Sequence, residues 1–239
     1  MISSRPDLAA VLAFVSAALF TALIVPLVRR AGMRWGLIDQ PDARKQHTTP
    51  MVRLGGVGIV AGFVLALLLI WGLGGFVELP QPRDALIWAS LAGALCFFVI
   101  GLADDLFALP PLPRLLGQLL VAMAVWSQGV RIGAIDLPFG SWGGLPGLIE
   151  LPDSLSLLAT VVWLVGITNA INWLDGLDGL AAGVSGIAAV GLLSVSYSLN
   201  QPAPGLLAAA LAGSCLGFLR HNFNPARIFM GDGGSYFLG

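Results

Sequence analysis

Polar residues that could bind a phosphate or a metal ion recur every third residue beside a long apolar run. They are Asn169, Asn172, Asp175 and Asp178, with Gly176 and Gly179 among them. Burying unpartnered amides and carboxylates costs free energy, so this series indicates a functional site. On a helix, a step of three residues turns the side chain by about 60°, so neighbouring members share a face and the set curves around a site. Each residue taken singly could instead cap a helix end.

A second acidic position closes an earlier apolar run, where Asp104 and Asp105 are adjacent. Like charges this close repel each other, so a proton or a cation is expected to compensate them. Mg²⁺ commonly takes one or two protein carboxylates and leaves its other positions to water and substrate phosphate. Capping of a helix end is the alternative explanation for one of the two residues.

Basic residues gather in a polar, proline-broken segment over residues 39–50, which contains Arg44, Lys45 and His47. Its prolines make the segment poorly suited to a helix. Arginine offers bidentate contacts, so the cluster could neutralise substrate phosphates. It could equally anchor the chain on the cytoplasmic side and attract anionic lipid head groups. Composition leaves both interpretations open.

The segment over residues 220–235 joins basic residues, a glycine-rich turn and a further carboxylate. Asn224, Arg227 and Asp232 are its candidate site residues. With the two earlier groups it completes a set of five candidate acids, and the expected topology puts all five on one side of a membrane.

The elements that must position these residues are membrane-spanning helices. The chain is 57% hydrophobic and only 10% charged, which is typical of an integral membrane protein. Seven apolar runs approach the ~20 residues that a spanning helix needs, and they lie at about 8–28, 55–76, 85–103, 112–128, 155–171, 180–199 and 205–219. We therefore predict an all-α integral membrane protein, a polytopic helical bundle with about seven complete spans plus the start of an eighth, forming a single domain over 1–239. Because that eighth run has only begun at Gly239, we expect the polypeptide to be incomplete at its C-terminal end.

Small residues indicate how the spans pack against one another. Gly58 and Gly62, and likewise Gly213 and Gly217, have the four-residue spacing of close helix contacts in membranes. The outer segment over residues 131–152 has glycine turn signals between short apolar pieces and predicts a small hairpin.

Lysine and arginine set the expected orientation. Nine of the twelve lie in the connections after the odd-numbered spans, and three lie in the N-terminus and the other connections. The excess on one side puts the N-terminus outside and makes loops of about 29–54, 104–113, 172–179 and 220–235 cytoplasmic.

Charge and composition also limit the function. A net charge of −1 gives no basic surplus for binding nucleic acid. An ion-coupled membrane transporter is one alternative, since acids and amides in spans also mark ion pathways. Transporter sites, however, usually lie near the bilayer midplane between internal repeats, and we find no convincing repeat. A non-catalytic, truncated membrane protein is a third alternative.

Four segments together resemble the polyprenyl-phosphate N-acetylhexosamine-1-phosphate transferases of glycosyltransferase family 4, the superfamily that also contains the phospho-MurNAc-pentapeptide translocase. The segments are residues 39–47 with Gly55 and Gly56, Asp104-Asp105 with Arg114 and Gln118, residues 169–180, and residues 224–235. Their order and shared side make the match more specific than any one motif. The first segment resembles the branch that uses simple UDP-N-acetylhexosamines.

The resemblance implies transfer of an N-acetylhexosamine-1-phosphate from a UDP-sugar such as UDP-GlcNAc to polyprenyl (undecaprenyl) phosphate, with release of UMP. The implied setting is the initiation of cell-surface glycans such as lipopolysaccharide O-antigen or cell wall, at a bacterial cytoplasmic membrane, with the active site facing the cytoplasm. It implies Mg²⁺ as cofactor, with Mn²⁺ as the alternative. The lipid bilayer and both substrates are the expected partners, and a homodimer is kept open.

The resemblance also implies roles for individual residues. Asp232 would ligate the metal together with Asp105, and Asp104 would deprotonate or orient the lipid phosphate. The remaining catalytic acids would be Asp175 and Asp178. The expected substrate-binding residues are Arg44, Lys45, His47, Arg114, Asn169, Asn172, Asn224 and Arg227.

This sequence departs from the family in two respects. Arg114 stands where much of the family has lysine, which keeps the charge but changes the contact geometry. The family also continues with further helices and a histidine-bearing cytoplasmic loop, which the 239 residues do not contain.

Overall fold

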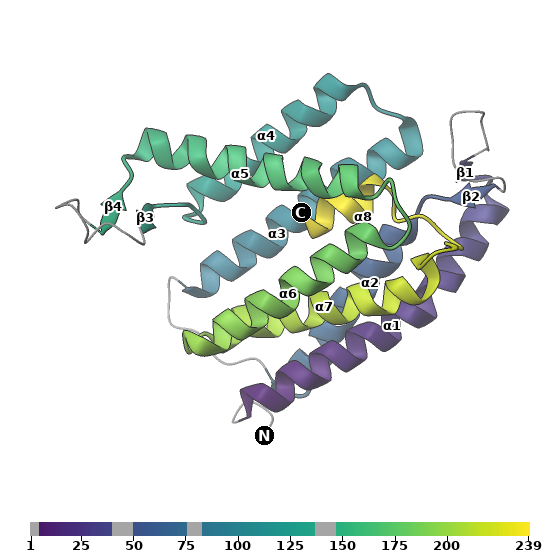
Figure 1. The fold of residues 1–239 in the computed structure, drawn as a ribbon, viewed down its shortest axis with the longest axis horizontal. Coiled ribbons are helices and arrows are strands. Elements are labelled where there is room, and N and C mark those ends of the chain that lie inside the picture. The colour runs from purple at the N-terminus through teal and green to yellow at the C-terminus, as the bar shows by residue number, and fades with distance from the viewer. Residues whose placement is uncertain (1–4, 40–49, 76–82, 137–146) are drawn as a thin grey trace.

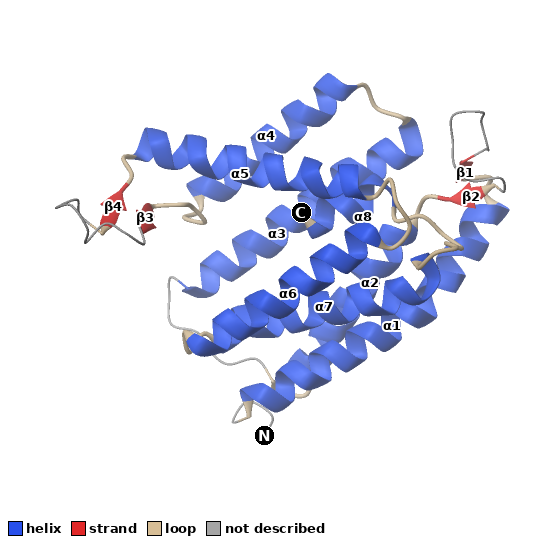
Figure 2. Cartoon of the chain, in the orientation of Figure 1, coloured by secondary structure: helices blue, strands red, loops and turns tan. Residues whose placement is uncertain are grey.

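The structure is a computed structural model and describes residues 5–39, 50–75, 83–136 and 147–239. These residues form a helical assembly with two small hairpins and no central sheet (Figures 1 and 2). The helices are α1 (Pro6–Arg34), α2 (Gly55–Gly72), α3 (Arg83–Phe107), α4 (Pro111–Ser127), α5 (Asp153–Leu174), α6 (Leu180–Ser198), α7 (Pro202–Asn222) and α8 (Gly231–Leu238). The predicted all-α class is confirmed.

Six helices in the described part of the chain are long and apolar enough to cross a membrane, namely α1, α2, α5, α6, α7 and the Ala85–Phe107 portion of α3. The fourth expected span differs. Its helix, α4, has 17 residues, which at 1.5 Å per residue reaches about 26 Å, short of the ~30 Å hydrocarbon core. Pro110 and Pro111 limit it at one end and Gly129, with a φ of +94°, limits it at the other.

Small residues bring α1, α2 and α7 into close contact, as the spacing predicted. A side chain at Gly213 would overlap the carbonyl group of Phe14, and one at Gly217 would overlap that of Ala18. A side chain at Gly62 would overlap the backbone and hydroxyl of Thr21, whereas one at Gly58 would overlap the Val25 side chain. Backbones can approach this closely only because these positions carry no side chain.

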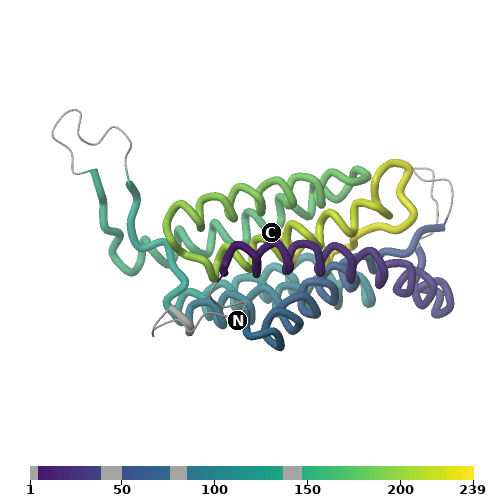
Figure 3. Tube along the Cα trace, turned by 90° about the horizontal axis from the view of Figure 1, so that it is seen from below, coloured from purple at the N-terminus to yellow at the C-terminus, as the bar shows by residue number. Residues whose placement is uncertain are grey.

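Two short hairpins lie at opposite ends of the helices. Strands β1 (Ile38–Asp39) and β2 (Met51–Val52) pair next to the end of α1. Strands β3 (Ala134–Asp136) and β4 (Leu148–Glu150) form the predicted outer hairpin, which projects away from the helices in Figure 3.

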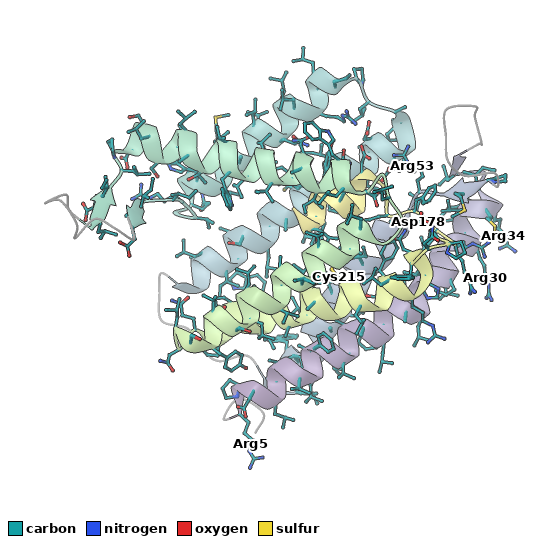
Figure 4. The ribbon with its side chains drawn as sticks, viewed as in Figure 1. Arg5, Arg30, Arg34, Arg53, Asp178 and Cys215 are labelled. Atoms are coloured by element: carbon teal, nitrogen blue, oxygen red, sulfur yellow. The ribbon has the colours of Figure 1, made fainter. Side chains whose placement is uncertain are left out.

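The connections that were expected on the cytoplasmic side meet at one end of the bundle (Figure 1). Figure 4 labels Arg30, Arg34, Arg53 and Asp178 at that end and Arg5 at the other. We call the end that carries Asp178 the loop end. The candidate acids come from helix termini and loops at this end.

Helix α8 is short and is fixed to the start of α2 by backbone hydrogen bonds. The amides of Gly55 and Gly56 donate to the carbonyls of Phe229 (2.9 Å) and Met230 (2.8 Å). A side chain at Gly56 would overlap the backbone of Gly234, and one at Gly101 would overlap the Asp232 carbonyl. The first turn of α8 is therefore packed directly on the backbones of α2 and α3.

Candidate active site

Two carboxylates hold the first turn of α8 in place. Both oxygens of Asp105 accept backbone N–H groups, from Asp232 and from Gly233, each at 2.9 Å. Asp175 accepts the N–H of Gly231 at 3.2 Å, where the backbone has a φ of +78°. These N–H groups belong to the start of a helix and have no partner within it. Asp105 and Asp175 therefore supply that partner and fix the residue between them, Asp232.

Asp232 points its carboxylate at three side-chain donors from three different elements. Arg114 of α4 donates to Oδ2 at 3.1 Å, while Asn172 of α5 donates to Oδ1 at 3.0 Å. Arg53, just after β2, donates to Oδ1 at 3.3 Å. Asp232 is thus the point where cationic and polar groups from most of the loop end converge.

Arg114 joins two of the acids. Its Nη1 pairs with Asp104 as well as with Asp232. Because a carboxylate pair needs a compensating positive charge, this guanidinium holds Asp104 and Asp232 side by side.

Burial and repulsion between the acids raise the proton affinity of two loop-end groups. Burial raises the pKa of Asp175 to about 8, with Asp105 and Asp232 adding to the effect and the Gly231 amide and Arg53 opposing it. Burial likewise raises the pKa of Asp232 to about 6, with a further increase from Asp104 and opposition from Asn172 and Arg53. Both carboxyl groups therefore hold protons more tightly than exposed aspartates do.

The two amides of α5 differ in their partners. Asn172 bonds to Asp232 and to the Ser235 hydroxyl at 2.9 Å. Asn169 donates instead to Gln118 at 2.7 Å and to the Val165 carbonyl at 2.8 Å. Asn172 thus contacts the acids directly, whereas Asn169 ties α5 to α4.

Asp178 serves the loop between α7 and α8. It accepts the side-chain amide of Asn224 at 3.1 Å and the backbone N–H of Ala226 at 2.9 Å. Buried Asn222 makes a second tie, since it accepts the Gly179 N–H and donates to the Ile228 carbonyl, both at 3.0 Å. Arg227 is exposed, and its backbone N–H donates to the backbone carbonyl of His221.

The structure thus brings together six of the predicted site residues, namely Asp104, Asp105, Arg114, Asn172, Asp175 and Asp232. Asn169 lies about one helical turn away from Asn172, and Asp178 and Asn224 meet at the neighbouring loop. Arg44, Lys45 and His47 lie outside the described residues. The chemical roles assigned to all of these residues remain predictions.

Arg53 is the residue at this site that sequence reasoning missed. It was counted only among the basic residues that set membrane orientation. The one signal in the sequence was its position three residues before Gly56. Because Gly56 packs against the backbone of α8, Arg53 lies beside the acids. The sequence spacing does not show that packing, so the contact could not be predicted from it.

The oxygen donors suit a hard divalent cation in number and type. In the part of the chain that is described, no three His, Cys, Asp or Glu side chains form a ready-made metal cage. Mg²⁺ does not need one, since one or two carboxylates suffice when water and substrate phosphate supply the rest. Asp232 and Asp104 already gather cationic groups and fit that requirement. Asp105 fits less well, because backbone N–H groups already occupy both of its oxygens.

Comparison with protein families gives a match over more than half of the chain. The family described as glycosyl transferase family 4 matches residues 87–239, which contain every acid of the site.

Curated relatives cover nearly the whole chain. A probable undecaprenyl-phosphate N-acetylglucosaminyl 1-phosphate transferase of Bacillus subtilis (strain 168) is 38% identical over 96% of this chain and 60% of its own length. A decaprenyl-phosphate N-acetylglucosaminephosphotransferase of Mycobacterium tuberculosis (strain ATCC 25618 / H37Rv) is 35% identical over 94% of this chain and 56% of its own length. A phospho-N-acetylmuramoyl-pentapeptide-transferase of Desulforudis audaxviator (strain MP104C) is 34% identical over 97% of this chain and 72% of its own length. The chain thus spans less than two thirds of the first two relatives.

Proposed function

Because this chain belongs to glycosyl transferase family 4 and is a bacterial multi-pass membrane protein, we propose that it transfers an N-acetylhexosamine-1-phosphate from a UDP-sugar to a polyprenyl phosphate. An oxygen of the lipid phosphate attacks the phosphorus that carries the sugar, the bond between the two phosphates breaks, and UMP leaves. The names of two relatives support N-acetylglucosamine as the sugar.

The convergence on Asp232 is the observation that carries this proposal. Phosphoryl transfer depends mainly on positioning and on neutralising negative charge. Two guanidinium groups and an amide converge on Asp232 at the end of the membrane-length helices, so positive charge and fixed polar groups are both available there. A soluble nucleotide and a membrane-embedded phosphate can meet at such an edge.

The proposed cofactor is Mg²⁺, with Mn²⁺ as the alternative. Asp232 and Asp104 are the proposed ligands, and the bound cation offsets the charge of the substrate phosphates. Asp104 also orients the lipid phosphate or accepts its proton. Arg114 lies between the two acids and is placed to contact phosphate oxygens from either substrate.

The loop end is the proposed cytoplasmic face. UDP-sugars are cytoplasmic, and the basic residues labelled in Figure 4 lie mainly at this end. Family membership favours the transferase over the ion-coupled transporter that composition had left open.

The proposal is tested by supplying membranes that contain the protein with labelled UDP-N-acetylglucosamine and polyprenyl phosphate. We expect label to move into the lipid fraction, chelation of divalent metal to stop it, and added Mg²⁺ to restore it. Absence of lipid-linked label with every UDP-N-acetylhexosamine tried would overturn the proposal. If transfer continued after chelation, the metal would no longer be part of the proposal.

A further inference from the structure

Arg53 combines a fixed backbone with an accessible side chain. The neighbouring Val52 carbonyl accepts the Phe229 N–H at 2.9 Å, and Gly55 and Gly56 bond to the same segment that precedes α8. The guanidinium at the other end of the side chain is in contact with solvent, since the Arg53 side chain is 47% exposed. The residue is therefore anchored beside the acids but can reach molecules that arrive from solution.

The contact between Arg53 and the acids is the most replaceable one at the site. A single Nη2 atom lies 3.3 Å from Oδ1 of Asp232 and 4.0 Å from Oδ1 of Asp105. Arg114 and Asn172 approach Asp232 more closely, and Asp105 is satisfied by backbone N–H groups. A single-point, half-exposed ion pair is weak compared with a bidentate one.

A divalent cation on Asp232 would leave Arg53 without its partner. Both the cation and Nη2 of Arg53 would use Oδ1 of Asp232. The displaced, exposed guanidinium would then be available to pair with the phosphates of a nucleotide diphosphate.

We propose that Arg53 is a diphosphate-binding residue and that its guanidinium competes with the divalent cation for Oδ1 of Asp232. Arginine suits this role because its planar fork pairs with phosphate oxygens as well as with a carboxylate. The inference rests on the proposed function, since it takes a nucleotide diphosphate as the substrate group.

Two binding titrations on the protein in lipid nanodiscs test the inference. Calorimetry with Mg²⁺ alone reports competition for Asp232, and calorimetry with UDP in saturating Mg²⁺ reports diphosphate binding. In Arg53→Ala we expect Mg²⁺ to bind several-fold more tightly and UDP to bind about tenfold more weakly, the effect of losing one charge-assisted contact. Arg53→Lys keeps the charge but not the fork and should recover only part of the UDP affinity.

Arg220→Ala is the matched control, because Arg220 is an exposed arginine in the last turn of α7 at the same end of the bundle. It should leave both affinities unchanged. Weaker Mg²⁺ binding or unchanged UDP binding in Arg53→Ala, with a melting temperature like that of the unmutated protein, would overturn the inference. A lowered melting temperature in both Arg53 variants would assign the residue a structural role instead. If the unmutated protein binds neither Mg²⁺ nor UDP, the proposed function fails and the inference fails with it.

Discussion

Asp105 and Asp232 lie side by side but have different kinds of partner. The side chain of Asp105 is only 2% exposed and bonds to backbone, whereas that of Asp232 faces arginines and an amide. A carboxylate whose oxygens accept the N–H groups at a helix start would have to give up those bonds to bind a metal ion. One that faces side-chain cations can accept a metal ion in their place. We therefore infer that Asp105 positions the start of α8 and that Asp232 is the carboxylate that binds the metal.

The raised pKa values predict that Mg²⁺ stabilises the protein more at high pH than at low pH. With pKa values of about 6 for Asp232 and about 8 for Asp175, the folded protein favours the protonated carboxyls. The stability this contributes is complete below the unfolded pKa near 3.8 and is lost as the pH rises through 6 and then 8. A metal ion on Asp232 would bind only the deprotonated carboxylate, so it would restore the part of this stability that Asp232 loses.

Thermal unfolding with and without Mg²⁺ measures this difference. The gain in melting temperature from Mg²⁺ should be small at about pH 5 and several degrees at about pH 8. Asp232→Asn should lose most of the gain. An equal gain at both pH values would show that Asp232 does not bind the metal.

Much of the site was predictable at the residue scale because burial of acids is expensive. The spacing of Asn172 and Asp175 and the adjacent pair Asp104-Asp105 identified residues that do meet. Hydrogen bonds between segments far apart in the sequence distinguish Asp105 from Asp232. Such bonds also hold Arg53 beside the two acids. No local pattern encodes them.

At the scale of elements, α8 decides the geometry of the site. Its eight residues begin with Gly231 and carry Asp232 into the acids. A helix this short is not stable alone, so its position depends on docking against other elements. The sequence predicted the start of an apolar run here, but the docking depends on backbone contacts at Gly56 and Gly101 that hydrophobicity does not report.

Gly56→Ala should therefore destabilise the protein. Its new methyl group would overlap the backbone of Gly234, which cannot move as freely as a side chain, and such overpacking costs about 1–3 kcal/mol. Gly183→Ala is the control, because a methyl group on this helical glycine of α6 would have no neighbouring atom within 4 Å. Thermal unfolding should show a lower melting temperature for the first variant only. Equal melting temperatures would mean that α8 is not docked through Gly56.

At the scale of the whole molecule, hydrophobic runs and charge bias identified the helices and the end of the bundle where the acids meet. Six of the seven expected spans have the required length in the described part of the chain. The fourth does not, because prolines fix where α4 begins and so shorten the helix. Hydropathy alone does not show this shortening. Which end faces the cytoplasm is a prediction from charge.

Cysteine labelling tests that orientation. In a background without Cys96 and Cys215, a membrane-impermeant maleimide should label Arg131→Cys on intact cells. It should reach Arg34→Cys, at the loop end, only after the membrane is opened. Ready labelling of Arg34→Cys on intact cells would place the acids on the side without UDP-sugars.

The central claim is that Asp232 binds the metal for sugar-phosphate transfer. Its most direct test is the exchange of labelled UMP into UDP-N-acetylglucosamine, with Mg²⁺ and polyprenyl phosphate supplied. Asp232→Asn keeps the shape of the side chain but removes its charge, so exchange should fall by about a hundredfold or more, while Asp153→Asn at the opposite end changes little. Exchange near the unmutated rate in Asp232→Asn, with unchanged dependence on Mg²⁺, would contradict the account.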